Sequence, residues 1–562
     1  MPDGIEHAAA FVAAAITPKP QLVIHSGNLP ATVYALRDLL TTSNALFDRG
    51  GLVQVIIPTD GSVPTAVRLT KHSVVMEAHR LCEPVKTTEH GKVIPVTLPE
   101  RVAQMYLDMH DWKLQPLAGI STAPLLSPDG SVRTVEGYDC GTGLWCANVR
   151  PVNFPKRPTT ENAADALDML RQTFRTFPFA DAACRQESAL GVVDLDCPPE
   201  QDESAFLVAV MTAVCRPSLW LAPGFLFTAP GVSGAGSGKG LLVRAICAIA
   251  FGIRPRAFTA GGDRKELDKR LSAELIEAQP SLFLDNANGL TLRSDTLASV
   301  LTERPARVRI LGETRMATLN STAFVAITGN GLTVTEDLAR RFIPCELDAR
   351  CENPEVRPFA AGFLEEIERC RAELLAAVLT IWRWGRQNVA DLDRGKPLGS
   401  FETWAEWCRD PLLTLGCRDP VERIEFLKSK DPQRQRVAEL FTTWWAHHGP
   451  NPKTVNDLAQ AVRNVVDPQM RGRQYLAMAI SRLAGTRAAG FVLSRQPSAG
   501  HWTAATYALT QEVPTNGTGH RTDRAHQPNG APAAPWGSPM GPMGPTVSPA
   551  DGGSAQPNFS HR

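Results

Sequence analysis

A glycine-rich stretch near the middle of the chain constrains its fold more than any other feature. Residues 229–242 read APGVSGAGSGKGLL, so glycines crowd ahead of Lys239. The flanking residues predict a buried strand over 225–229 and an apolar helix over 240–251. Backbone N–H groups of such a loop converge on an anion at the helix N-terminus, where the helix dipole also favours negative charge. The stretch therefore predicts a phosphate-binding loop for a nucleoside triphosphate.

The match to the phosphate-loop pattern is incomplete at two positions. Ser233 stands where the first glycine is usual, and Gly240 replaces the Ser or Thr whose hydroxyl holds magnesium. The pattern therefore supports nucleotide binding more strongly than it supports hydrolysis. A structural glycine loop that ends in a surface lysine is the alternative. The residues expected to contact the nucleotide are Gly234, Gly236, Ser237, Gly238, Lys239 and Gly240.

Composition adds few restrictions. The chain has 562 residues, 43% of them apolar, which is enough for two to four domains with buried cores. Its formal net charge is zero, so any nucleic-acid contact must come from local basic patches. The twelve cysteines are scattered without a Cys-x-x-Cys pair, as in the reduced thiols of a cytoplasmic protein. Since no apolar stretch reaches spanning length, we expect a soluble protein with no membrane partner.

Changes of pattern along the chain divide it into six segments. Strands and helices alternate between 219 and 348, which predicts a parallel sheet with helices on both faces. The expected segments are a mixed α/β domain (1–155), a helical lead-in (156–218), a phosphate-loop core (219–350), a helical region (351–430), a winged-helix-like domain (431–512) and a disordered tail rich in Gly, Pro and Ser (513–562).

Two predicted core strands end in polar residues. Residues 281–285 form an apolar run that ends in Asp285, which the carboxyl edge of a parallel sheet would place beside bound phosphates as a magnesium ligand. Asn286 follows it, and an amide can orient water but cannot take its proton. Glu303 is a more distant candidate base. A simple Asp-Asn turn at the end of the strand is the alternative.

The second such strand, 323–330, ends in Asn330, which can sense the terminal phosphate or position the attacking water. Gly329-Asn330-Gly331 equally suits an ordinary turn. Further on, Arg340 and Arg341 end a short helix, where a guanidinium can stabilise transition-state charge across a subunit boundary. A solvated, charged helix end is the alternative.

Residues 304–320 alternate like two strands around Gly312-Glu313, and Arg307, Arg309 and Arg315 would decorate this hairpin. Cations so placed can hold a sugar-phosphate backbone without reading its sequence. A basic ribbon that is merely solvated fits the same residues.

The C-terminal part has a different order of predicted elements: three helices (436–447, 454–465, 472–483) come before two strands (491–495, 504–509). This order suggests a winged helix, which either lies on duplex DNA or docks a protein. Trp444 and Trp445 are expected in its core. The cations expected on its third helix and wing are Arg473, Arg482, Arg487, Arg495 and His501.

The order of glycine loop, Asp-ending strand, basic hairpin, Asn-ending strand and arginine pair resembles the AAA+ ATPases. It is most similar to superfamily III-like replicative helicases of phages and integrative mobile elements. The resemblance covers about residues 20–510 and rests on these segments: GAGSGKGLL (234–242), LDNAN (284–288), ITGN (327–330), DLARRF (337–342), GYD (137–139), TGL (142–144), PLGSFETW (397–404) and RDPL (409–412).

The resemblance implies an α/β fold whose central sheet has strand order 5-1-4-3-2. A proline at position 344 places the strand 343–348 at a sheet edge, as the fifth strand of that order requires. It further implies that Lys239 holds phosphates, Asp285 holds Mg²⁺, Asn330 senses the nucleotide and Arg340 or Arg341 is a finger acting in trans. The implied partners are ATP, Mg²⁺, single-stranded or forked DNA and identical subunits in a hexameric ring.

Residues 1–150 contain no zinc-ribbon cysteines and no acidic triad, so a primase would be a separate protein. The leading interpretation is an ATP- and Mg²⁺-dependent DNA helicase or translocase. A replication initiator or loader that binds ATP but hardly hydrolyses it is the alternative, because Gly240 and Asn286 depart from the hydrolytic pattern. A nucleotide-modifying kinase is a third interpretation, which leaves the basic hairpin without a role.

Overall fold

The computed structural model describes most of the chain between residues 19 and 511. Predictions on Ser233, the Gly312-Glu313 turn, Arg315, His501 and the tail from 513 onward fall outside the described residues. Within those residues, no helix combines the length and the apolar character needed to cross a bilayer. The described residues are 19–59, 64–147, 149–187, 190–231, 234–261, 264–310, 316–356, 361–496 and 504–511.

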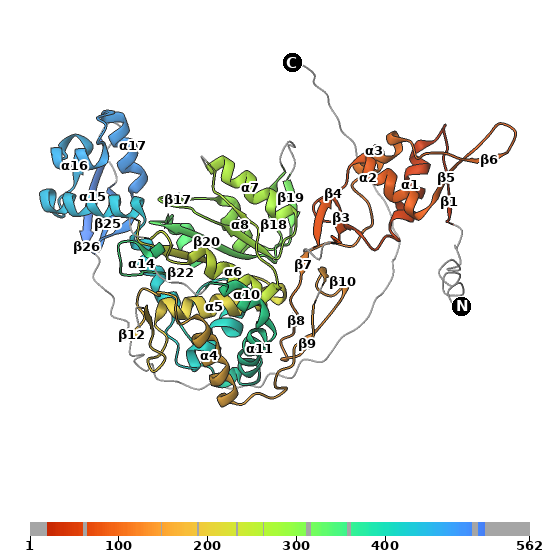
Figure 1. Ribbon diagram of the computed structural model, residues 1–562. Helices are drawn as coiled ribbons and strands as arrows, with labels where there is room; N and C mark the ends of the chain where they lie inside the picture. The colour runs from red at the N-terminus through yellow and green to blue at the C-terminus, as the bar shows by residue number, and fades with distance from the viewer. Residues whose placement is uncertain are drawn as a thin grey trace, which may run out of the picture. The chain divides into compact units, whose positions relative to one another are not determined.

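Small sheets and short helices make up the N-terminal part (Figure 1). The first helix, α1 (Leu29–Leu40), is capped by Asn28, since the Asn28 side chain accepts a hydrogen bond from the Ala31 N–H. The elements are β1 (Gln21–Val23), α1 (Leu29–Leu40), β2 (Leu46–Asp48), β3 (Leu52–Ile56), β4 (Thr65–Arg68), α2 (Lys71–Leu81), β5 (Glu83–Thr87), β6 (Val93–Pro95), α3 (Glu100–Asp108), β7 (Gly119–Ser121), β8 (Leu125–Leu126), β9 (Val132–Arg133), β10 (Gly137–Asp139) and β11 (Leu144–Cys146).

The expected helical lead-in over 156–218 contains a hairpin as well as helices. Helices α4 (Thr160–Phe174) and α5 (Gln201–Cys215) flank the antiparallel pair β12 (Cys184–Glu187) and β13 (Leu190–Val193). The hairpin escapes a pattern search because every residue of β12 is exposed, so no apolar alternation marks it. Helix α5, by contrast, is buried on nearly all sides, as its apolar composition requires.

A five-stranded parallel sheet forms the centre of the protein. Its strands are β14 (Gly224–Ala229), β15 (Ala257–Phe258), β16 (Ser281–Leu284), β20 (Phe324–Asn330) and β22 (Phe342–Glu346). They lie in the order β15-β16-β20-β14-β22 and every pair is parallel. Numbered along the chain and read from β22, this order is 5-1-4-3-2. Pro344 lies in β22, an edge strand, where a missing N–H leaves no ladder bond unmade.

Helices cover both faces of this sheet (Figure 1). Phe225 and Phe227 of β14 point to one face, where α6 (Lys239–Phe251) packs together with α5. Leu226 points to the other face, against α7 (Arg264–Ile276) and α8 (Asp295–Thr302). The strand is therefore apolar throughout, as a strand buried on both sides must be.

Between β16 and β22 the chain adds short elements beside the sheet. They are β17 (Thr291–Leu292), the antiparallel hairpin β18 (Ala306–Arg309) and β19 (Met316–Leu319), β21 (Thr333–Val334) and α9 (Glu336–Ala339). Helices follow β22, as expected for 351–430. They are η2 (Pro354–Val356), α10 (Phe363–Arg369), α11 (Arg371–Gln387), η3 (Val389–Asp391), α12 (Glu402–Trp404), the π-helical turn η4 (Ala405–Arg409), α13 (Asp410–Thr414), η5 (Pro420–Glu422) and α14 (Arg423–Ser429).

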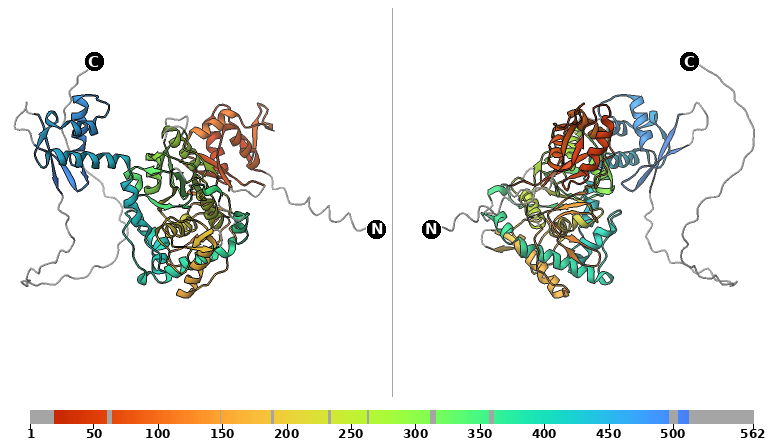
Figure 2. Two further views of the ribbon diagram at one scale, coloured as in Figure 1. Left: turned by 60° about the vertical axis from the view of Figure 1, so that its left-hand side comes forward. Right: turned by 90° about the vertical axis from the view of Figure 1, so that its right-hand side faces the viewer.

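The C-terminal module, blue in Figure 2, contains the three predicted helices and the two predicted strands. Trp444 is fully buried in its core and Trp445 packs against Phe491, so the prediction for both tryptophans is confirmed. The module adds two short strands that give a sheet of order β23-β26-β25-β24. Its elements are α15 (Pro432–His448), β23 (Lys453–Thr454), η6 (Val455–Asp457), α16 (Gln460–Val466), α17 (Arg473–Leu483), β24 (Arg487–Ala488), β25 (Phe491–Gln496) and β26 (Thr506–Gln511).

Candidate nucleotide-binding site

The glycine-rich loop joins the end of β14 to the start of α6, as its sequence predicts. Gly236 and Gly238 have φ of +74° and +94°, the left-handed region that side chains other than glycine rarely adopt. A Cβ at Gly234 would lie 2.3 Å from the Pro230 carbonyl oxygen, and one at Gly236 would lie 2.6 Å from Glu355 Cα. The loop therefore takes this shape only with glycine at these positions.

Lys239 is the first residue of α6 and is folded back onto the loop. Its Nζ donates hydrogen bonds to the Gly234 carbonyl oxygen (2.7 Å) and to Ser237 Oγ (2.9 Å). Burial lowers the pKa of the Lys239 ammonium to about 8, although the charge of Asp285 acts in the opposite direction. The N-terminus of α6 has no side-chain cap, because its N-cap is Gly238. Its first N–H groups and the ammonium thus converge on one small region that suits an anion.

Asp285 follows β16 at the carboxyl edge of the sheet. Its Oδ1 accepts hydrogen bonds from Thr328 Oγ1 (2.5 Å) and from the Asn286 N–H (3.1 Å), and its Oδ2 lies 3.3 Å from Arg244 Nη2. Asn286 is exposed and has a φ of +59°, a conformation that asparagine tolerates in turns. The Asp-Asn turn that the sequence allows is therefore present, and this same turn places the Asp285 carboxylate at the edge of the sheet.

Asn330 ends β20, the neighbour of both β14 and β16. It pairs in register with Ala229, the last residue before the glycine loop. Its backbone N–H donates to Asn288 Oδ1 (2.7 Å), whereas its own Oδ1 is buried and has no hydrogen-bond partner among the described residues. That oxygen lies 2.8 Å from the position a Gly234 Cβ would take. A buried polar atom without a partner is costly, so its place beside the loop points to a bound polar group.

The remaining predicted catalytic residues do not join this cluster. Arg340 and Arg341 follow α9 and both pair with Asp337, at 2.6 and 2.5 Å. Glu303 accepts a hydrogen bond from Ser299 Oγ at the end of α8. Within the described chain, no hydrogen bond or ion pair joins any of these three residues to Lys239 or Asp285.

Two residues at the site, Thr328 and Arg244, are not part of the phosphate-loop sequence pattern. Thr328 lies two residues before Asn330 on β20, and its hydroxyl reaches Asp285 across the sheet. Arg244 lies on α6, four residues after Gly240, and a helix brings residues so spaced to one face. That spacing is the one signal that could have placed Arg244 beside the loop.

The donor set fits a resident magnesium ion poorly. Gly240 has no hydroxyl, and the Asp285 oxygens already face Thr328 and Arg244. Among the described residues, no group of three or more His, Cys, Asp or Glu side chains is arranged to hold a metal ion. Any magnesium here would arrive with the nucleotide and take most of its ligands from phosphates and water.

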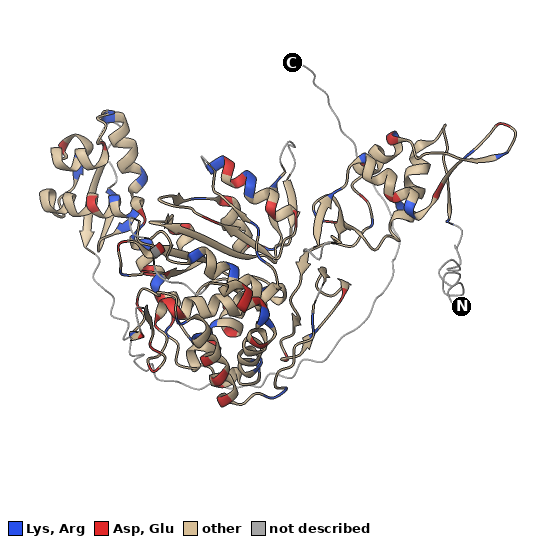
Figure 3. Ribbon diagram, in the orientation of Figure 1, with Lys and Arg blue, Asp and Glu red and all other residues tan. Residues whose placement is uncertain are grey.

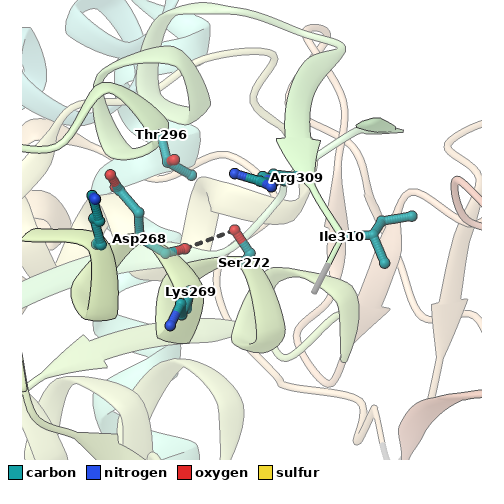
Figure 4. A pocket seen from close by; sticks show the side chains of 7 residues that line it. Asp268, Lys269, Ser272, Thr296, Arg309 and Ile310 are labelled. Carbon is teal, nitrogen blue, oxygen red and sulfur yellow. Dashed lines mark hydrogen bonds between the residues drawn. The ribbon is translucent and has the colours of Figure 1, made fainter. Parts of the chain in front are cut away.

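A second cationic region lies beside the β18–β19 hairpin. Arg307 and Arg309 point outward from β18, while Ala306 and Val308 are buried. Arg309 also lines a pocket of about 380 Å³ between β18, α7 and α8 (Figure 4). Its other lining residues are Lys265, Asp268, Lys269, Ser272, Thr296 and Ile310.

Three cations thus face this pocket against one carboxylate. That carboxylate, Asp268, already accepts a hydrogen bond from Ser294 Oγ (2.5 Å) and lies 4.0 Å from Arg264. Over the whole of α7, however, acidic and basic residues alternate (Figure 3). Along α7 itself, basic residues are therefore offset by acidic ones, and Lys269 of the pocket pairs with Glu266 (3.5 Å).

The C-terminal module presents four of its predicted cations to solvent. Arg473 starts α17, Arg482 lies in its last turn, Arg487 starts β24, and Arg495 lies in β25. All four are exposed. This arrangement suits a polyanion and equally suits an acidic protein surface.

Comparison with known proteins gives distant structural similarities. Neither protein-family models nor curated proteins give a match to the chain. Solved structures of similar arrangement include one described as an active helicase, SCCmec type IV Cch (12% identity, 83% of this chain and 97% of that one, TM-score 0.31). Others are the NrS-1 C-terminal region (11%, 81% and 96%, 0.33) and the Aeropyrum pernix ORC1 protein in complex with DNA (13%, 57% and 90%, 0.18).

Proposed function

We propose that this chain is an ATP-dependent motor of the AAA+ type that moves along DNA as a helicase or translocase in the replication of a phage or mobile element. The observation that carries the proposal is the convergence of the glycine loop, Lys239, Asp285 and Asn330 Oδ1 at one edge of a parallel sheet, where that oxygen has no partner in the part of the chain that the structure describes. A triphosphate seated there would satisfy the orphaned amide oxygen through water or magnesium. It would also draw the Lys239 ammonium away from the Gly234 carbonyl.

DNA is proposed as the nucleic acid along which the protein moves because of the β18–β19 hairpin and the pocket beside it. Arg307, Arg309, Lys265 and Lys269 gather on one side of the core, and such cations hold phosphates of any sequence. The roles proposed for the other residues are phosphate sensing for Asn330, water orientation for Asn286 and a finger in trans for Arg340 or Arg341. Such a finger requires identical subunits side by side, so a ring is part of the proposal.

The decisive experiment measures ATP turnover with and without single-stranded DNA. We expect DNA to stimulate turnover by the unmodified protein and Lys239→Ala to abolish that stimulation. Arg369→Ala, which removes an exposed guanidinium paired with Glu366 on α10, is the matched control and should leave turnover unchanged. Full stimulated turnover by Lys239→Ala would contradict the assignment of this lysine.

A replication initiator or loader remains the second candidate, favoured by Gly240 and by the absence of a carboxylate at Asn286. Such a protein would use ATP to assemble on DNA and hydrolyse it slowly. Strand separation on a forked duplex distinguishes the two, because a loader binds and assembles but leaves the strands annealed.

A further inference from the structure

Arg244 occupies an unusual position on the first turns of α6. It lies four residues after Gly240, so both face the same side of the helix. Its Nη2 pairs with Asp285 Oδ2 at 3.3 Å, and its guanidinium carbon lies 5.3 Å from the centre of the Phe283 ring. The end of β16 therefore holds the guanidinium from two sides.

The guanidinium fills the space that a side chain at position 240 would need. An ideal Cβ on Gly240 would lie 2.6 Å from Arg244 Nη1 and 3.6 Å from Asp285 Oδ1. A Ser or Thr at this position would require the end of the Arg244 side chain to move, which a flexible side chain can do. In the conformation seen here, the missing side chain of Gly240 leaves room for the guanidinium beside Asp285.

The two terminal nitrogens of Arg244 face different groups. Nη2 is engaged by Asp285, whereas Nη1 is turned toward the first turn of α6, next to Lys239. Among the described residues, no hydrogen bond occupies Nη1 or Nε of Arg244. A guanidinium presents its donors in a planar fork that matches phosphate oxygens, so it can keep Asp285 and still bind a phosphate.

We propose that Arg244 is a ligand of the nucleotide's terminal phosphates within its own subunit, and that it supplies the positive charge that a hydroxyl-bound magnesium supplies in the usual phosphate loop. This inference rests on the proposed nucleotide site. Lys239 and Arg244 then hold the phosphates together, so nucleotide binding does not require Mg²⁺, whereas turnover can still depend on it.

The test is a titration of a fluorescent ATP analogue with excess Mg²⁺ and with EDTA. The unmodified protein should bind equally well in both. Arg244→Ala should lose at least about tenfold in affinity in EDTA, which is the scale of a charge-assisted hydrogen bond to phosphate. The double variant Arg244→Ala with Gly240→Ser should recover affinity in Mg²⁺ but not in EDTA. Arg256→Ala, which removes an exposed guanidinium paired with Glu277, is the control and should behave like the unmodified protein.

Two results would overturn the inference: loss of affinity by the unmodified protein in EDTA, or Arg244→Ala binding as tightly as the unmodified protein in EDTA. Arg244→Lys keeps the charge without the fork and should bind with intermediate affinity. It provides the comparison if circular dichroism shows that Arg244→Ala does not fold. If the unmodified protein binds no nucleotide under either condition, the proposed function itself fails.

Discussion

At the residue scale, the half-buried ammonium of Lys239 should make nucleotide binding depend on pH. Burial lowers its pKa to about 8 in the free protein, and bound phosphates would raise that pKa because opposite charge favours the protonated form. When the pH is above the pKa of Lys239 in the free protein, ATP binding is therefore coupled to the uptake of a proton by Lys239. ATP affinity should therefore be full below about pH 8 and fall as the pH rises past it.

Calorimetric titration with ATP over a series of pH values measures this dependence. Lys239→Arg should make the affinity nearly independent of pH, since an arginine keeps its proton throughout this range. Lys239→Ala should lose the affinity at every pH. An equal fall of affinity with pH in Lys239→Arg would show that another group titrates.

Two neighbouring glycines provide a matched pair of substitutions. Gly234→Ala places a methyl group 2.3 Å from the Pro230 carbonyl oxygen and 2.8 Å from Asn330 Oδ1. Gly231→Ala meets nothing closer than Gly331 Cα at 3.8 Å. We expect Gly234→Ala to destabilise the protein by about 1–3 kcal/mol and to abolish nucleotide binding, because overpacking displaces the loop. Gly231→Ala should bind normally, and thermal unfolding with and without ATP compares the two.

At the scale of elements, the proposed DNA contact combines the β18–β19 hairpin with α7. Lys265→Ala and Arg309→Ala should each weaken single-stranded DNA binding and reduce the slope of log affinity against log salt by about 0.7 per lost phosphate contact. Fluorescence anisotropy with a labelled oligonucleotide at several salt concentrations gives both quantities. An unchanged slope in both variants would mean that this pocket does not contact DNA.

Most elements of the central sheet could be predicted from sequence, because a strand buried on both faces leaves a continuous apolar run. Residues 281–284 and 324–330 show this pattern, and the polar residue at the end of each run marked the site edge. Strand β22 was likewise placed at an edge by its proline. The β12–β13 hairpin could not be predicted, since its exposed residues carry no apolar alternation.

The places of the glycine loop, Lys239, Asp285 and Asn330 in the fold could be predicted, because each follows or begins a regular element. The spacing of Arg244 four residues after Gly240 is a local signal that places it beside the loop, but its pairing with Asp285, 41 residues away, could not be predicted. The same holds for Glu355, whose backbone approaches Gly236 only through the tertiary fold. Contacts between distant segments thus decide the part of the site that sequence patterns leave undetermined.

At the scale of the whole molecule, the proposed ring makes each site depend on two subunits. The Arg340 side chain is 60% exposed and that of Arg341 is 14% exposed, so Arg340 is better placed to reach a neighbouring subunit. Lys239→Ala and Arg340→Ala should each abolish ATP turnover alone. Mixed in equal amounts, they should recover turnover at about a quarter of the sites, since that share combines an intact loop with an intact neighbouring arginine. A mixture without activity would contradict a finger in trans.

The central claim is that the loop before Lys239, together with Asp285 and Asn330, holds the phosphates of a nucleoside triphosphate. Isothermal titration calorimetry of the unmodified protein with ATP tests it most directly. We predict a saturable heat of binding that disappears in Lys239→Ala and persists in Gly231→Ala. No heat with ATP, in Mg²⁺ or in EDTA, would contradict the account.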